Sequence, residues 1–86
     1  MIDEGIKFLD KNYPNWRSKI NIEALDMADG YNCIEGQLEK SAYRFNAIHK
    51  LSYNDCINLG FECEPAKDNA ILTKLWRGII ECQNHK

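Results

Sequence analysis

Apolar residues recur every three or four positions along most of this chain, which is the spacing of one face of an α-helix. The first such stretch predicts a helix over Ile2–Asn12, with Ile6 and Leu9 on its apolar side. We expect that helix to stop before Pro14, because a proline disfavours helical backbone at the residue that precedes it. Pro14 also suits the first turn of a second, short helix that carries Trp16.

The pattern between Ile20 and Met27 is compatible with either a strand or a helical turn. Ile20 and Ile22 alternate as in a strand, whereas Ile22, Leu25 and Met27 have helical spacing. We interpret this stretch as a turn-like connection, because the Asp-Gly pair that follows it is typical of a loop.

Helical spacing resumes over residues 33–48, and Gly36 weakens the pattern because a glycine inside a helix costs ~1 kcal/mol relative to alanine. Ser52 and Asp55 then have the spacing of a capping box at the start of another helix. Gly60 is placed to end that helix in a left-handed conformation, with Phe61 packing back against it.

The last helix is the clearest, and we expect it to start at Asp68 or Asn69 after a polar loop. Six apolar residues make up its predicted apolar face: Ile71, Leu72, Leu75, Trp76, Ile79 and Ile80. The whole pattern predicts an all-α fold, a small single domain of four to five short helices over residues 1–86.

Chain length changes this picture in one respect. A chain of 86 residues buries only about 60–65% of the surface that its unfolded form exposes, and 9 aromatic residues are available for so thin a core. We therefore expect a homo-oligomer, because an interface between copies supplies further burial. No apolar run approaches the roughly 18–20 residues of a membrane span, so we expect no membrane partner.

The chain contains four cysteines. The first residues lack a basic stretch followed by an apolar one, so we expect no signal peptide, a cytoplasmic location and free thiols. We interpret Cys33, Cys56 and Cys82 as small core residues on helices. Only Cys82 and His85 have the spacing of a zinc-ligand pair, so we expect neither a metal site nor a cofactor.

No motif in the sequence predicts catalysis. A cysteine nucleophile needs a histidine base that a third group orients, and neither His49 nor His85 lies in a recognisable motif with Cys33. The stretch 34–38 lacks the glycines and the lysine of a phosphate-binding loop. We therefore expect a protein that is not an enzyme.

The charge distribution gives one candidate site for a partner. The net charge is −2, and the stretch 20–39 contains five carboxylates and no lysine or arginine. We expect no nucleic-acid binding there, since phosphate contacts require clustered cations. Carboxylates can instead mimic nucleic acid and compete for a partner's basic groove, and the candidates for such contacts are Glu23, Asp26 and Asp29.

A second candidate site combines aromatic and cationic residues after Pro14. Trp16, Arg17 and Lys19 are of the types that dominate binding hot spots, and they could stack on a base and pair with phosphate. The alternative is that Trp16 anchors the core while Arg17 and Lys19 are exposed.

The stretch YNCIEGQL, residues 31–38, raises the same choice between site and structure. We expect Cys33 and Ile34 to face the core, and Gly36 to permit close packing against a neighbouring element such as the one that carries Trp16. Gln37 is a candidate to hydrogen-bond either a loop backbone or a ligand.

Several short motifs resemble a loose group of short phage and prophage proteins of Gram-positive bacteria. They are P-x-W-x-x-K-I at Pro14–Ile20, L-D-M at Leu25–Met27, C-I-x-G-Q-L at Cys33–Leu38, G-F at Gly60–Phe61 and L-T-x-x-W at Leu72–Trp76. The chain departs from that pattern after Leu38, where EKSAY stands in place of a stretch with an early glycine.

The resemblance implies a phage accessory protein that acts by binding and counters host immunity by sequestration. The first hypothesis is that the ligand is a small nucleotide immune signal, held by Trp16, Arg17, Lys19 and Gln37. A second is an anti-CRISPR-like inhibitor that binds a host defence protein through the acidic residues Glu23, Asp26 and Asp29. A third is a small phage regulator of gene expression.

Overall fold

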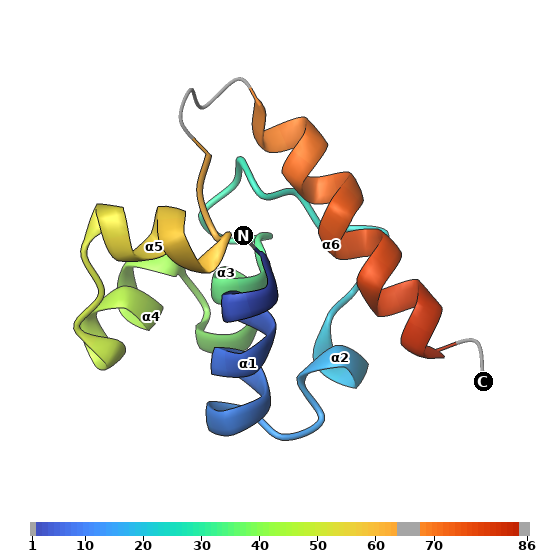
Figure 1. Ribbon diagram of the computed structural model, residues 1–86, viewed down its shortest axis with the longest axis horizontal. Coiled ribbons are helices and arrows are strands. Elements are labelled where there is room, and N and C mark those ends of the chain that lie inside the picture. The colour runs from blue at the N-terminus through green and yellow to red at the C-terminus, as the bar shows by residue number, and fades with distance from the viewer. Residues whose placement is uncertain (1, 64–67, 85–86) are drawn as a thin grey trace.

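The computed structural model describes residues 2–63 and 68–84. Six helices form within these ranges, and Figure 1 shows α4 and α5 on one side of α1 and α6 on the other. The helices are α1 (Ile2–Asn12), α2 (Trp16–Lys19), α3 (Ile34–Glu39), α4 (Ala42–His49), α5 (Tyr53–Leu59) and α6 (Asn69–Asn84). The predicted all-α fold is confirmed, and no helix in the described ranges is long and apolar enough to cross a membrane.

The extra helix arises from a break that the sequence pattern did not reveal. Residues 33–48 form two helices rather than one, because Lys40 adopts a left-handed conformation with φ 76° and ends α3. A right-handed helix cannot continue through such a residue. Ser41 then caps α4, and its side chain accepts a hydrogen bond from the Arg44 N–H at 3.0 Å.

Local signals in the sequence place most other helix ends. Helix α1 covers the predicted residues and stops before Pro14. Pro14 itself precedes α2, which starts at Trp16 after Asn15 in a left-handed conformation. Helix α5 begins with the predicted capping box between Ser52 and Asp55, and Gly60 ends it with φ 82°.

The segment 20–32 is a series of turns, as interpreted from the sequence. It is fastened to α6 by side chains of that helix. The Met27 N–H donates to the Thr73 hydroxyl at 2.8 Å in a buried position. The Arg77 guanidinium donates to the carbonyls of Ile22 and Leu25, both at 3.3 Å.

The two tryptophans lie at the centre of the core. Trp16 is 1% exposed and Trp76 is fully buried, and their rings meet edge to face with centroids 5.9 Å apart. Trp76 also stacks on Phe61, and its indole N–H donates to the Gly60 carbonyl at 2.7 Å. Aromatic burial of this extent dominates the packing energy of a small domain.

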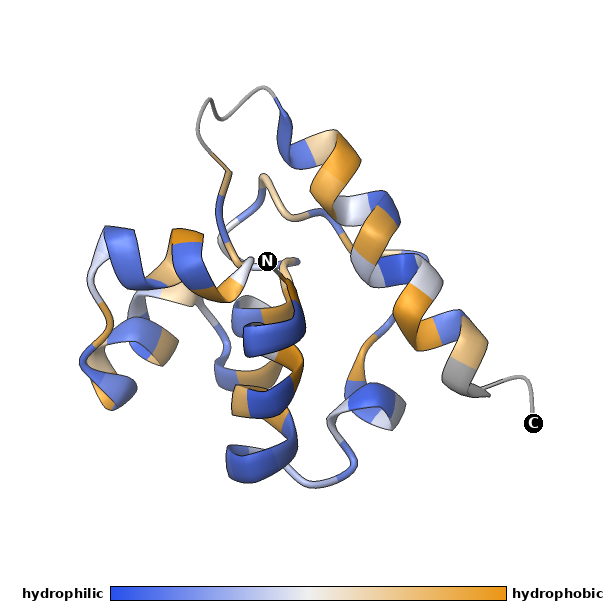
Figure 2. Ribbon diagram, viewed as in Figure 1, coloured by the Kyte–Doolittle hydropathy of each residue, from blue (hydrophilic) through white to orange (hydrophobic). Residues whose placement is uncertain are grey.

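Helix α6 buries only half of its predicted apolar face. Leu72, Trp76 and Ile80 are buried, whereas Ile71 is 60% exposed and Leu75 is 43% exposed. Ile71 and Leu75 of the predicted apolar face are therefore not part of the core. Figure 2 shows hydrophobic residues along α6, at the edge of the molecule.

Candidate functional site

Trp16, the central residue of the aromatic and cationic candidate, is a core residue. Its indole N–H donates to the Asp10 carboxylate at 2.9 Å, and Trp76 packs against the ring. The guanidinium carbon of Arg17 lies 4.5 Å from the ring centroid of Trp16. The core-anchor alternative for Trp16 is therefore confirmed, and its ring has no exposed face on which a base could stack.

Arg17 and Lys19 differ in their surroundings. The Arg17 guanidinium pairs with the Asp10 carboxylate at 3.1 Å, and 24% of its side chain is exposed. Its Nε atom is buried and has no hydrogen-bond partner in the described part of the chain. Lys19 is exposed. Of the three residues Trp16, Arg17 and Lys19, only Lys19 is both charged and free to reach a ligand.

Gln37 hydrogen-bonds loop backbone, which was one of its two predicted roles. Its side-chain oxygen accepts from the Asn21 N–H at 2.6 Å. Its side-chain nitrogen donates to the carbonyls of Asn21 at 3.2 Å and Asn32 at 3.0 Å. Gln37 therefore ties α3 to both ends of the segment 20–32.

Gly36 lets the same segment pass close over α3. A Cβ atom at this position would clash with the Gly30 carbonyl oxygen and lie 2.6 Å from the Tyr31 carbonyl. The neighbour of Gly36 is therefore this loop and not Trp16, which corrects the expected contact. Cys33 and Ile34 face the core as predicted, and the Cys33 sulfur accepts a hydrogen bond from the Gly36 N–H.

The segment 20–32, which we call the acidic loop, holds two of its three carboxylates in place. Asp26 accepts from the Ala28 N–H at 2.9 Å, and Asp29 accepts from the Tyr31 N–H at 2.8 Å. The Tyr31 hydrogen bond is the main reason that the pKa of Asp29 lies below its ordinary value. Glu23 is exposed, and its carboxylate accepts no hydrogen bond from the described residues.

Two tyrosines are exposed at the acidic loop, Tyr31 within it and Tyr43 beside it. Tyr31 is 71% exposed and Tyr43 is 85% exposed. The Ala42 N–H donates to the Gly30 carbonyl at 2.7 Å. These two residues directly precede Tyr43 and Tyr31, so the backbones at the two tyrosines lie close together. Both are among the nine aromatic residues that were expected to be available for the core. A signal was present for Tyr31, which follows an Asp-Gly turn and so belongs to a surface loop.

The cysteines are not grouped as metal ligands in the described residues. All four are free thiols, and burial raises the pKa of Cys33 to about 11, the opposite of what a nucleophile needs. No group of three or more His, Cys, Asp or Glu in the described ranges could hold a metal ion. Cys82 is exposed, contrary to expectation, and His85 lies outside the described residues.

Two internal polar clusters were not anticipated from the sequence. Glu35 is only 4% exposed, and burial raises its pKa to about 8. The thiol of Cys56 lies 3.8 Å from a Glu35 oxygen and 3.3 Å from the Asn46 side-chain oxygen. In the second cluster the Tyr13 hydroxyl donates to Glu39 at 2.8 Å and lies 2.7 Å from Nε2 of His49.

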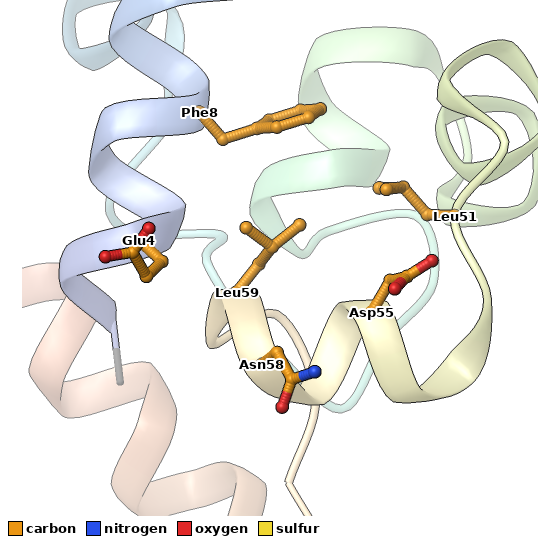
Figure 3. A pocket seen from close by; sticks show the side chains of 6 residues that line it. All are labelled: Glu4, Phe8, Leu51, Asp55, Asn58 and Leu59. Carbon is orange, nitrogen blue, oxygen red and sulfur yellow. The ribbon is translucent and has the colours of Figure 1, made fainter.

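A pocket of about 390 Å³ lies between α1 and α5, apart from every candidate residue predicted above. Figure 3 shows Phe8 from α1 and Leu59 from α5 extending into the same space, with Leu51 on its far side. The lining residues are Glu4, Phe8, Leu51, Asp55, Asn58 and Leu59. None of these lining residues is cationic, and the two carboxylates among them, Glu4 and Asp55, are exposed.

The chain was compared with family models, curated proteins and solved structures, and no significant match to any of them was found.

Proposed function

We propose that this protein is a non-catalytic, phage-type binding protein that inhibits a host defence protein through the acidic loop. The carrying observation is that the loop is preorganised. Gln37 of α3 and Thr73 and Arg77 of α6 hold its backbone. Backbone N–H groups of the loop hold the carboxylates of Asp26 and Asp29 in fixed positions. A preformed surface loses less conformational entropy on binding than a flexible acidic segment does.

The exposed tyrosines give this proposal a second element. Tyrosine supplies a large contact area at a small entropic cost and is enriched at binding hot spots. Tyr31 lies in the acidic loop, which has no basic residue, and Tyr43 lies beside it. We propose that the carboxylates attract the basic groove of the partner, as nucleic acid would, and that the two tyrosines then pack against it.

The role in countering host immunity rests on the resemblance to phage proteins in the motifs quoted above. The alternative in which the protein sequesters a small nucleotide signal receives no support from the position of Trp16, since that ring is buried. A role in regulating genes receives none from the acidic loop, because like charges repel phosphate.

The test uses variants that remove charge while preserving the loop. Asp26→Asn keeps an oxygen that can accept from the Ala28 N–H, and Asp29→Asn keeps one for the Tyr31 N–H but loses the acceptor of the Asn32 side chain. Glu23→Gln removes a carboxylate that holds no part of the loop. Asp3→Asn, an exposed residue of α1, is the control for loss of one charge. Each protein is added to DNA cleavage reactions of a panel of purified RNA-guided nucleases.

We expect the parent and Asp3→Asn to inhibit at least one nuclease, with inhibition that weakens steeply as salt rises. The triple variant should stay folded with a slightly lower melting temperature, because one hydrogen bond of Asp29 is lost, and it should lose inhibition. Tyr31→Ala with Tyr43→Ala should speed dissociation. Equal inhibition by the folded triple variant would exclude the acidic loop as the binding surface. The proposal is excluded if the parent inhibits no nuclease in the panel and also fails to restore phage plating on hosts that carry these nucleases.

A further inference from the structure

The outward side of α6 carries an apolar stripe that the core does not use. Its central residues, which we call the outer seam, are Ile71, Leu75, Gly78 and Cys82. All four are exposed, and successive members are four, three and four positions apart. This is the spacing of the a and d positions at which two helices pair in a coiled coil.

Gly78 has no packing role inside the molecule. A Cβ atom at this position would have nothing within 4 Å among the described residues. Glycine in the middle of a helix costs ~1 kcal/mol relative to alanine, and no internal contact offsets that cost here. A glycine in an outer seam allows the backbone of a second helix to approach closely.

Charges beside the seam select one way of pairing. Lys74 and Glu81 are exposed and lie on the same flank of the seam, one heptad apart. In an antiparallel pair of identical helices, the same flank of each helix meets, so that Lys74 reaches Glu81 of the partner subunit and Glu81 reaches Lys74 of the partner subunit. A parallel pair would instead place Lys74 beside the opposite flank of the partner helix and form neither ion pair.

We propose that two copies of this chain associate through antiparallel α6 helices, with Leu75 against Gly78 of the partner subunit and Ile71 against Cys82 of the partner subunit. The occupant is a second copy because the seam is complementary to itself in charge and in size: each large residue meets a small or short one. Such a contact is isologous and closes after two subunits.

The dimer should dissociate on dilution. The seam extends from residue 71 to residue 82, which is about 16 Å of helix at 1.5 Å per residue. So short a contact is far smaller than a standard interface between permanently associated subunits. The outer seam contains no residue of the acidic loop, so the two proposals can fail separately.

Cross-linking tests the register. In the proposed pairing Ile71→Cys faces the native Cys82 of the partner subunit, so oxidation should produce a disulfide-linked dimer on a non-reducing gel. Ala70→Cys, exposed but beside the seam, is the matched control and should remain largely monomeric. Ile71→Cys combined with Cys82→Ser should not cross-link, because the two introduced thiols would lie at opposite ends of the pair. Cross-linking of that double variant would show a parallel pair and overturn the proposal.

Charge exchange tests the pairing without cysteine chemistry. Sedimentation over a concentration series should show a monomer–dimer equilibrium for the parent. Lys74→Glu or Glu81→Lys alone should weaken dimerisation by about tenfold or more, since each removes two ion pairs and creates two repulsions. The exchange of both, Lys74→Glu with Glu81→Lys, should restore it to near the parental value. A parent that stays monomeric at about 1 mM, or a dimer that neither single change weakens, would overturn the proposal.

Discussion

Two sides of the interior differ in chemistry. The side formed by α2 and α6 is built from apolar residues, with Trp16, Leu72, Trp76 and Ile80 all buried. The side formed by α3 and α5 buries three ionisable groups, Cys33, Glu35 and Cys56. The Cys56 thiol contacts the Glu35 carboxyl. Both sides are closely packed, but only one of them can gain or lose protons.

The difference shows which part of the stability depends on pH. Burial of apolar surface contributes the same free energy at any ordinary pH. A buried carboxyl contributes according to its protonation, because burial disfavours the charged form. Replacing a residue on the apolar side should therefore lower the free energy of unfolding equally at every pH. Replacing a buried ionisable residue should change it by an amount that depends on pH.

The largest effect is expected from Trp76→Ala. Truncation of a buried tryptophan costs about 3–5 kcal/mol, and the Gly60 carbonyl would lose the indole N–H that now donates to it. A small domain has only ~5–15 kcal/mol in total, so this variant should be largely unfolded at every pH. Circular dichroism during urea unfolding measures the loss.

Leu75→Ala is the matched control on the same helix, because Leu75 is 43% exposed. At concentrations below dimer formation it should change the free energy of unfolding by less than about 1 kcal/mol. Similar losses in the two variants would mean that the two sides of α6 are not buried differently.

The second effect depends on pH and concerns Glu35→Gln. The pKa of Glu35 is about 8 in the folded protein and is raised from 4.5 mainly by burial. Between these two values the unfolded chain releases a proton that the folded protein keeps, so the stability of the parent should fall as pH rises from about 4.5 to about 8 and then level off. Below pH 4.5 both states are protonated and this cost is absent.

Glu35→Gln removes that titration, so the difference in stability between variant and parent should grow by a few kcal/mol over the same window. Urea unfolding at pH 4.5, 6 and 8 measures it, and Glu23→Gln, at an exposed position, is the control. A constant difference between Glu35→Gln and the parent at all three pH values would contradict a buried, protonated Glu35.

The third effect compares two glycines, one on each side. Gly36→Ala should destabilise by about 1–3 kcal/mol, because a Cβ atom there meets the backbone of Gly30 and Tyr31. Gly78→Ala should stabilise the dilute monomer by up to ~1 kcal/mol, since it improves helix propensity in open space. Thermal melts of the two variants should shift in opposite directions, and a shared direction would contradict this assignment of the glycines.

The smallest effect is expected from Asp10→Asn. The asparagine oxygen can still accept from the Trp16 indole, and only the partly exposed ion pair with Arg17 is lost. We expect a change of ~1 kcal/mol or less in the free energy of unfolding, because exposed ion pairs contribute little. Asp10→Ala, which also leaves the indole N–H without its acceptor, should cost more. Equal costs for the two would show that the indole hydrogen bond does not contribute.

Much of the fold could be predicted because its signals are local. The capping box at Ser52, the glycine at position 60 and the proline at position 14 each act on their own backbone. The break at Lys40 could not be predicted in this way, since a lysine rarely adopts a positive φ and the apolar spacing continues across it.

The candidate site was less predictable because it depends on contacts between distant segments. The sequence left open whether Gln37 hydrogen-bonds a loop backbone or a ligand. Only the fold shows that its partners are backbone groups of Asn21 and Asn32. Tyr43 is exposed because it lies two positions before the buried Phe45, on the opposite side of α4, and helical spacing alone could have separated the two. Composition likewise gives no sign that Glu35, unlike Glu23, is buried.

Helix α6 links two surfaces that were described separately. Its inner side carries Thr73 and Arg77, which fasten the acidic loop, and its outer side carries the seam. Pairing of the seam would restrain the motion of α6 and, with it, the residues that anchor the loop. Binding at one surface would therefore reduce the conformational entropy that binding at the other surface costs. Thermodynamic reciprocity then requires that a partner held by the loop strengthen self-association by the same factor by which self-association strengthens its binding.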